Sequence, residues 1–488
     1  MITKKFIRNS VIYTIAGALP MASAIILLPV YVEYIKSASV YGALILYMGF
    51  SLLVQVLVTY SFDTSIYNFY HDFKHNRAQL SVFVSSVFTF ILLVSLGIGA
   101  FFVVTGHWLF ERVYGDDQIS FYPYGLVAVV TGVFQSLFKV NSSLLQTQER
   151  AIGFLIQNLI SFSLIASFTI VGLHLFPNEL TGPMLGRLFA VTISGLWVLF
   201  NVYREYGFHY NFNLIKSTFG FNHPSLIYQI MQWFNNYYDK ILLKLYLPLE
   251  SLAQVGVYDF AFKCLQAIEF VLTGFYNSFF PKVLGITALQ TEKRTTVEIN
   301  RYYNGLTAVT IILVTGCIFI MPAVLQQLVD WFNRPQYLPV IKWIPYIAIT
   351  YLLRSFRFYV AMPYASLKYS KPLPLFYLVI VTIKIAGMIL LIPKFGIHGA
   401  IIATWVGYIV EVTILFFGVK NKFSIQFNAF KLIVAPLLLA LIIGGIEPLF
   451  GGTYPLLLHA FYIFLGAALL IWAYRNELKA FEWKKIIK

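Results

Sequence analysis

Apolar runs of about 20 residues recur along the whole chain and are separated by short polar segments. Wound as an α-helix at 1.5 Å per residue, such a run crosses the ~30 Å hydrocarbon core of a bilayer. A hydropathy window of about 19 residues predicts fourteen transmembrane helices, near residues 10–32, 41–62, 80–104, 121–143, 153–175, 183–203, 224–247, 254–281, 303–329, 340–363, 373–393, 397–418, 431–450 and 453–474. The pattern therefore predicts an all-α polytopic membrane protein.

The longer connections divide these helices into groups. Segments 204–222 and 282–302 separate six, two and six helices. We expect an N-terminal lobe at residues 1–211 with helices 1–6, a C-terminal lobe at 212–420 with helices 7–12, and an extra helix pair with a basic tail at 421–488. A weak internal similarity, Tyr41-Gly42 against Gly256-Val257-Tyr258 at two helix starts, is consistent with the parallel repeats of transporters.

Composition and charge refine this topology. Only 11% of the residues are charged, against about 25% in soluble domains. The net charge of +15 comes from short Lys/Arg clusters, and no basic domain is set apart for nucleic acid. Most of these clusters fall on one side of the predicted membrane, and the opposite loops hold only Lys36, Arg112, Arg334 and Lys394. The positive-inside rule then predicts that both termini lie in the cytoplasm.

Motifs of soluble enzymes are missing from the sequence. It contains no GxxxxGK[ST], HExxH or GxSxG motif, which argues against ATP hydrolysis, a zinc protease or a serine hydrolase. The two cysteines, Cys264 and Cys317, lie in apolar runs, where a thiol acts as a small apolar group. The longest predicted outer loop, 105–120, is too short for an enzyme domain. We therefore expect no enzyme activity, no catalytic residue, no metal site and no cofactor.

Six of the cations in predicted helices lie at membrane depth, where each costs at least a few kcal/mol unless it is paired or faces water. They are Lys240, Lys244, Lys263, Arg354, Arg357 and Lys384. We expect them to line a water-filled chamber and to bind a multiply charged anion such as a diphosphate, which guanidinium groups engage through paired hydrogen bonds. Lys139, Arg187 and Lys342 lie near helix ends and are expected to be snorkelling anchors.

Amides and aromatic rings are dense in the predicted helix 224–247. Gln232, Trp233, Asn236 and Tyr237 are candidate sugar contacts, although interfacial or packing roles remain open. Five acidic residues are candidates either for coupling to H⁺ or Na⁺ or for pairing with nearby cations. They are Asp63, Asp239, Asp259, Glu269 and Glu411. Asp259 and Lys263, four residues apart, could also form a structural pair.

Several short motifs have the order found in one transporter family. They are Asp239-Lys240-Ile241-Leu242, Val255-Gly256-Val257-Tyr258, Phe280-Pro281, Pro335-Gln336-Tyr337, Leu367-Lys368-Tyr369-Ser370-Lys371, and LIPKFGIHGAIIATWVGY at 391–408. This set resembles Wzx-like flippases of O-antigen and other lipid-linked oligosaccharides. These flippases form the polysaccharide-transport branch of the MOP (multidrug/oligosaccharidyl-lipid/polysaccharide) exporter superfamily.

The resemblance implies two six-helix lobes in a V-shaped, MATE-like arrangement around a cationic cavity. It implies alternating access that moves an undecaprenyl-diphosphate-linked oligosaccharide to the outer leaflet, with membrane lipids, a polysaccharide polymerase and chain-length proteins as partners. Residues 15–18 of the first predicted helix carry no charge, unlike the lipid II flippases, which makes a peptidoglycan role less expected. A drug/cation antiporter of the same fold, a membrane-embedded polymerase or glycosyltransferase, and a scaffold protein remain alternatives.

Overall fold

The protein is described by a computed structural model. The description covers residues 12, 16, 17, 19, 26–115, 118–247, 250–288, 292–366, 369, 371–420, 427–447 and 456–475. Within these ranges the chain forms helices and no β-strand. The first predicted helix, 10–32, lies mostly outside the described residues.

The helices follow one another closely along the chain. They are α2 (Leu28–Tyr34), α3 (Ala38–Thr59), α4 (Phe62–Phe73), α5 (Arg77–Tyr114), η1 (Phe121–Gly125), α6 (Leu126–Thr147), α7 (Ala151–Leu175), α8 (Thr181–Tyr206), α9 (Phe212–Tyr246), α10 (Ser251–Ala288), α11 (Glu292–Phe332), η2 (Pro335–Trp343), α12 (Ile344–Ser355), α13 (Arg357–Ser366), α14 (Leu373–Phe395), α15 (Ile397–Val419), η3 (Phe430–Val434), α16 (Ala435–Ile446) and α17 (Leu456–Ala473).

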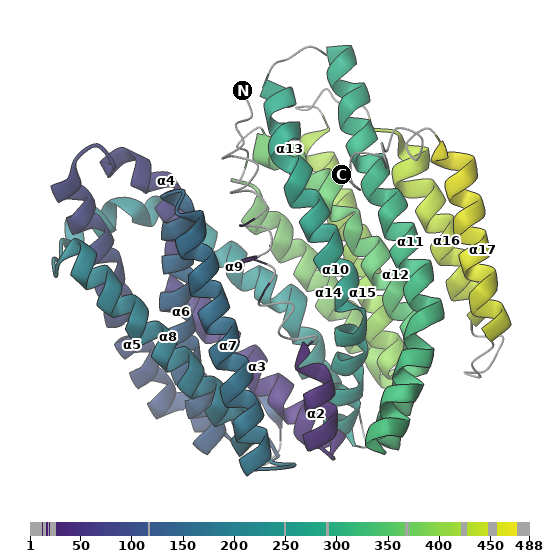
Figure 1. The fold of residues 1–488 in the computed structure, drawn as a ribbon, viewed down its shortest axis with the longest axis horizontal. Helices are drawn as coiled ribbons and strands as arrows, with labels where there is room; N and C mark the ends of the chain where they lie inside the picture. Colours follow the sequence, from purple (N-terminus) through teal and green to yellow (C-terminus); the bar gives the residue numbers. More distant parts are fainter. Residues whose placement is uncertain are drawn as a thin grey trace. The chain divides into compact units, whose positions relative to one another are not determined.

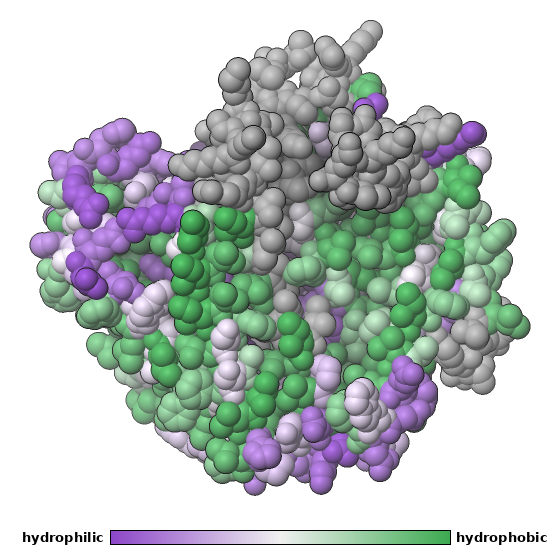
Figure 2. All heavy atoms as spheres, in the orientation of Figure 1, coloured by the Kyte–Doolittle hydropathy of each residue, from purple (hydrophilic) through white to green (hydrophobic). Residues whose placement is uncertain are grey.

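Eight helical segments in the described part of the chain are long and apolar enough to cross a membrane. They are Ala38–Phe73, Arg77–Tyr114, Phe121–Thr147, Ala151–Leu175, Thr181–Tyr206, Ile299–Phe332, Leu373–Phe395 and Ile397–Val419. Two shorter apolar helices, Phe430–Ile446 and Leu457–Ala473, follow them. Figure 2 shows hydrophobic residues along the middle of the helices and hydrophilic residues at their ends. The prediction of an all-α, multi-pass membrane protein is confirmed, and the helix order is consistent with about fourteen crossings.

Several helices are longer than the apolar windows that predict them. The loop expected at 105–120 is wrong, because α5 continues to Tyr114 and ends where Gly115 adopts a positive φ of 75°. The Asn76 side chain caps the other end of α5 by accepting hydrogen bonds from two backbone N–H groups. Asn211 caps α9 in the same way, so the expected connection 204–222 is helical from Phe212 onward. The expected connection 282–302 is helical at 282–288 in α10 and at 292–302 in α11, and residues 289–291 lie outside the description.

One predicted helix ends as expected and one is broken. Helix 41–62 corresponds to α3, which ends where Tyr60 and Ser61 adopt left-handed conformations, with φ of 48° and 60°, and α4 follows beyond the predicted span. Helix 340–363 becomes η2, α12 and α13, with a turn at Phe356 between α12 and α13. Neither turn holds a glycine or proline, the residues that usually mark such breaks.

Glycines allow close contact between helix backbones, as is common in membrane proteins. A Cβ atom on Gly172 of α7 would lie 2.2 Å from the Gly182 carbonyl oxygen of α8, and one on Gly182 would lie 2.4 Å from that of Gly172. The neighbouring helices α6, α7 and α8 run side by side (Figure 1). A Cβ atom on Gly42 of α3 would lie 1.9 Å from the Leu252 carbonyl oxygen of α10. The two helix starts that share the Tyr/Gly similarity therefore pack against each other.

The described chain forms two compact units. The first contains Met1–Asp259 and Leu373–Val381, and the second contains Phe260–Pro372 and Thr382–Lys488. In the first unit α9 packs against α3, α4 and α5, so this unit extends past residue 211. In the second unit α17 packs against α11, and α16 against α12. The lobe boundaries expected at residues 211 and 420 stay a prediction, and each unit is described by itself below.

Candidate functional site

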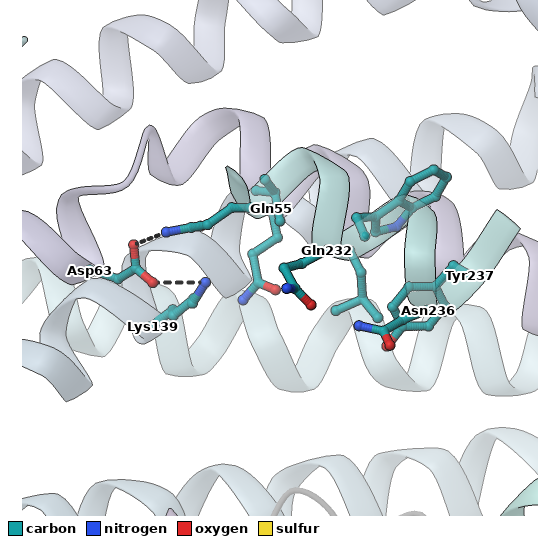
Figure 3. Close-up of a pocket in the computed structure, with 10 residues that line it drawn as sticks. Gln55, Asp63, Lys139, Gln232, Asn236 and Tyr237 are labelled. Carbon is teal, nitrogen blue, oxygen red and sulfur yellow. Dashed lines mark hydrogen bonds and ion pairs between the residues drawn. The ribbon is translucent and has the colours of Figure 1, made fainter. Parts of the chain in front are cut away.

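The first unit contains a polar pocket of about 330 Å³ between α3, α4, α6 and α9 (Figure 3). We call it the amide pocket. Its lining residues are Leu52, Gln55, Val56, Asp63, Lys139, Gln229, Gln232, Trp233, Asn236 and Tyr237. The α9 residues recur at intervals of three and four, which places them on one face of the helix. All four predicted sugar contacts thus line one pocket, while contact with a sugar stays a prediction.

The rings of the amide pocket are held by α3. Trp233 is buried, and its indole N–H donates to the Gly49 carbonyl oxygen over 2.8 Å. Tyr237 stacks on Trp233 with ring centroids 6.1 Å apart and an interplanar angle of 24°. The Tyr237 ring also lies close to Gly49, where a Cβ atom would make an ordinary contact of 3.6 Å with Tyr237 Cδ1. Tyr237 is only half-buried, so it is the ring that a ligand can reach.

An ion pair lies at one end of the amide pocket. Lys139 Nζ is 2.9 Å from Asp63 Oδ2, and Gln229 Nε2 donates to Asp63 Oδ1 over 3.1 Å (Figure 3). The expectation that Lys139 is only a snorkelling anchor is therefore wrong. Asp63 lies on another helix and 76 positions before Lys139 in the sequence, so the spacing of neighbouring residues could not predict this ion pair. Asp63, an ion-coupling candidate, is paired with a cation here.

Two amide groups of the pocket have buried atoms with no hydrogen-bond partner in the described structure. They are Oε1 of Gln229 and Nε2 of Gln232. Buried polar atoms normally have a partner, and an exception often marks a place where a ligand or water binds.

Arg187, the second cation expected to be a snorkelling anchor, is half-buried beside Gln135. In the amide orientation that satisfies both groups, the Gln135 side-chain oxygen accepts hydrogen bonds from Arg187 Nε and Nη2 over 3.1 and 3.0 Å.

A second polar group of the first unit is almost closed to solvent. Lys240 Nζ lies 3.6 Å from Asp239 Oδ1 and 3.6 Å from Asp259 Oδ1. Tyr258 donates to Asp239 Oδ2 over 2.9 Å, and Tyr41 donates to Asp259 Oδ2 over 3.4 Å. Lys240 thus has two carboxylate partners, and an anion placed there would meet both. The diphosphate role predicted for Lys240 stays untested, and the geometry favours a structural network.

The second unit contains a pocket of about 260 Å³ formed by α10, α12 and α13. We call it the arginine pocket. It is lined by Glu269, Leu272, Thr273, Tyr276, Tyr351, Arg354, Ser355, Arg357, Phe358 and Ala361. Arg354 and Arg357 both reach it although the turn at Phe356 separates their helices. Two of the six predicted diphosphate ligands therefore share a pocket.

Both arginines have carboxylate partners. Arg354 Nη1 donates to Glu269 Oε2 over 2.9 Å, and Nη2 lies 2.6 Å from Oε1, so the pair is bidentate. Arg357 Nε lies 3.3 Å from Oε1 of Glu411, whose side chain is 1% exposed. These contacts match the alternative that the acidic candidates pair with cations.

The remaining predicted cations lie elsewhere. Lys384 is buried, with its stem against Gly407 of α15 and its ammonium group 5.9 Å from the centre of the Tyr408 ring. Lys244 is buried on α9 of the first unit, and Lys263 is half-buried on α10 of the second. The single chamber predicted for all six cations stays a prediction. Among the residues that the structure describes, no group of three or more His, Cys, Asp or Glu side chains could hold a metal ion.

Helices long and apolar enough to cross a membrane define the class of multi-pass membrane proteins. Solved structures agree with this class. The fold matches "Lipid II flippase MurJ, inward closed conformation" with a TM-score of 0.69 and 15% identity, over 98% of this chain and 99% of that one. It also matches an inward-facing multidrug resistance MATE family transporter of the MOP superfamily, with a TM-score of 0.65 and 12% identity, over 86% and 98% of the two chains. The predicted MOP-type fold is confirmed.

The family follows from the sequence match. Residues 6–284 match the family described as polysaccharide biosynthesis protein, and the chain belongs to that family. It is also 24% identical over 251 residues to "Lsg locus putative protein 1" of Haemophilus influenzae (strain ATCC 51907 / DSM 11121 / KW20 / Rd), covering 49% of this chain. That match spans 57% of the relative's length. The predicted relationship to proteins of polysaccharide biosynthesis is thereby confirmed.

Proposed function

We propose that the protein is a flippase that moves an undecaprenyl-diphosphate-linked oligosaccharide from the cytoplasmic to the outer leaflet. Family membership supports a role in polysaccharide biosynthesis. The MurJ-like fold supports translocation of a lipid-linked substrate, because that neighbour is named as a lipid II flippase. The protein acts as a transporter and not as an enzyme, and the polyprenyl tail stays in the bilayer while the headgroup crosses.

The amide pocket is the observation that carries this proposal. Side-chain amides both donate and accept hydrogen bonds, which suits the many hydroxyl groups of a sugar. Four such amides line the pocket beside a tyrosine ring, on which the apolar face of a sugar can pack. Its volume of about 330 Å³ lies within the ~300–1,000 Å³ typical of ligand pockets. A helix that faced only lipid would not be expected to carry so many amides, because polar groups are unfavourable in hydrocarbon.

The diphosphate is assigned to the arginine pocket. Arg354 and Arg357 face it together, and guanidinium groups match the geometry of phosphate oxygens. Lys240 is left out because its side chain is only 10% exposed and lies beside two carboxylates, those of Asp239 and Asp259. Alternating access would expose these groups first to one side of the membrane and then to the other.

The other expectations accompany this proposal. The protein would lie in the bacterial inner membrane with both termini in the cytoplasm, and a polysaccharide polymerase and chain-length proteins would act beside it. Coupling to an H⁺ or Na⁺ gradient would involve an acidic group, and Asp63 is the candidate that borders the amide pocket.

A drug/cation antiporter is the main competing function, since MATE transporters share the fold. A cavity for cationic drugs should be acidic or apolar. The arginine pocket is lined instead by two arginines and one glutamate. Both arginines pair with carboxylates, so the pocket is neither acidic nor purely apolar.

The test replaces pocket amides in a strain whose surface glycan depends on this protein. Gln232→Ala and Asn236→Ala each remove hydrogen bonds to the sugar, and we expect surface glycan to fall about tenfold, as a loss of ~1.4 kcal/mol implies. Asn213→Ala is the matched control, because Asn213 is an exposed amide on α9 outside the pocket. Normal glycan in both pocket variants, at wild-type protein levels, would contradict the proposal.

A further inference from the structure

Glu269 holds Arg354 in the arrangement that a phosphate group would take. Two oxygens of the carboxylate meet two nitrogens of the guanidinium, over 2.9 and 2.6 Å. Carboxylate and phosphate engage the same guanidinium edge through the same two parallel hydrogen bonds. A phosphate that binds this edge of Arg354 must therefore displace Glu269.

The pair is open to such an exchange. The Arg354 and Glu269 side chains are 30% and 17% exposed, and both line the arginine pocket. The neighbouring pair differs, because Glu411 is 1% exposed and lies outside the pocket lining, with its Oε1 3.3 Å from Arg357 Nε. Glu411 is therefore a structural partner, whereas Glu269 faces the space that a ligand would fill.

A transport cycle gives this exchange a purpose. A half-buried cation without a partner is unfavourable, so Arg354 needs an anion whenever the headgroup is absent. A site that binds its substrate too tightly also releases it slowly. A carboxylate that belongs to the protein can do both: it pairs with the cation when the site is empty, and it competes with the bound headgroup so that the headgroup can be released.

We propose that Glu269 is a resident competitor for the diphosphate site. It pairs with Arg354 in the empty protein, gives way when the diphosphate binds, and pairs again as the diphosphate leaves. It thereby sets the affinity of the site and permits release. This inference rests on the proposed flippase function and adds the residue that tunes it.

The test measures binding of inorganic pyrophosphate to the purified full-length protein in lipid nanodiscs by calorimetry. Glu269→Gln keeps the shape and removes the competing charge, so pyrophosphate should bind about tenfold tighter, as the loss of one charge-assisted hydrogen-bonded competitor implies. Glu269→Ala should shift affinity in the same direction. Arg354→Gln should abolish the gain when combined with Glu269→Gln.

A matched control lies in the first unit. Arg150 and Glu205 form the same bidentate pair, over 2.9 and 2.7 Å, and line neither pocket. Glu205→Gln should leave pyrophosphate affinity unchanged. If Glu269→Gln and Glu269→Ala bind pyrophosphate no more tightly than wild type, or more weakly, Glu269 merely holds Arg354 in place and the inference is overturned.

A second readout separates this inference from the proposed function. In proteoliposomes, Glu269→Gln should translocate a lipid-linked oligosaccharide more slowly than wild type while binding pyrophosphate more tightly. Translocation by wild type without the affinity gain would overturn only the role of Glu269. The affinity gain without any translocation by wild type would overturn the flippase proposal and leave the anion site standing.

Discussion

At the scale of single residues, the amide pocket depends on the pair formed by Asp63 and Lys139. The two side chains are 13% and 36% exposed, and Gln229 adds a hydrogen bond to the carboxylate. The pair joins α4 to α6, and Gln229 extends the contact to α9. Its first role is therefore to fix three walls of the pocket relative to one another.

A double-mutant cycle tests this role. Asp63→Asn leaves Lys139 without its carboxylate, and we expect a loss of about 1 kcal/mol, since the pair is partly exposed and water screens it. Lys139→Gln should cost a similar amount. The double variant should recover part of the loss, because neither charge is then left unpaired. Thermal unfolding of the purified protein measures this, and strictly additive losses would show that the two residues do not interact.

Some of these residues could be predicted from sequence and others could not. The spacing of Gln232, Trp233, Asn236 and Tyr237 on α9 fixes a common helix face, so local periodicity was enough to group them. Partners such as Asp63 and Lys139, or Glu269 and Arg354, lie on helices far apart in the chain. Only tertiary packing brings them together, and these pairings could not be predicted from the spacing of residues in a single sequence.

At the scale of elements, hydropathy located the helices but not their ends. α5 extends through His107 and Glu111 to Tyr114. A hydropathy window detects only the apolar part of a helix, so it does not detect a polar continuation such as this one. The break at Phe356 between α12 and α13 was missed, because it lies inside the predicted helix 340–363 and holds no glycine or proline.

The contact between α3 and α10 is the element-scale feature most sensitive to mutation. Gly42→Ala would place a methyl group 1.9 Å from a backbone oxygen, which cannot move without shifting α10. We expect a loss of about 1–3 kcal/mol, as for other overpacked sites. Gly97→Ala on α5 is the control, because nothing lies within 4 Å of its new methyl group. Equal melting temperatures for the two variants would contradict the close packing.

At the scale of the whole molecule, family and fold support one activity from different directions. The polysaccharide family match covers residues 6–284, and the MurJ and MATE structures match across both units. The sequence alone predicted this class because its motifs and its helix count agree with the same family. The identity of the sugar cannot be read in this way, since the amides of the pocket suit hydroxyl groups in general.

Translocation by the isolated protein is the most direct test of the flippase proposal. Purified protein is reconstituted into vesicles that hold a fluorescent undecaprenyl-diphosphate oligosaccharide in both leaflets, and a glycosidase is added outside. We expect wild type to make the inner-leaflet pool accessible, and Gln232→Ala/Asn236→Ala to slow that access, while Asn213→Ala behaves as wild type. If vesicles with wild-type protein expose no more substrate than vesicles without protein, the protein is not a flippase for this lipid.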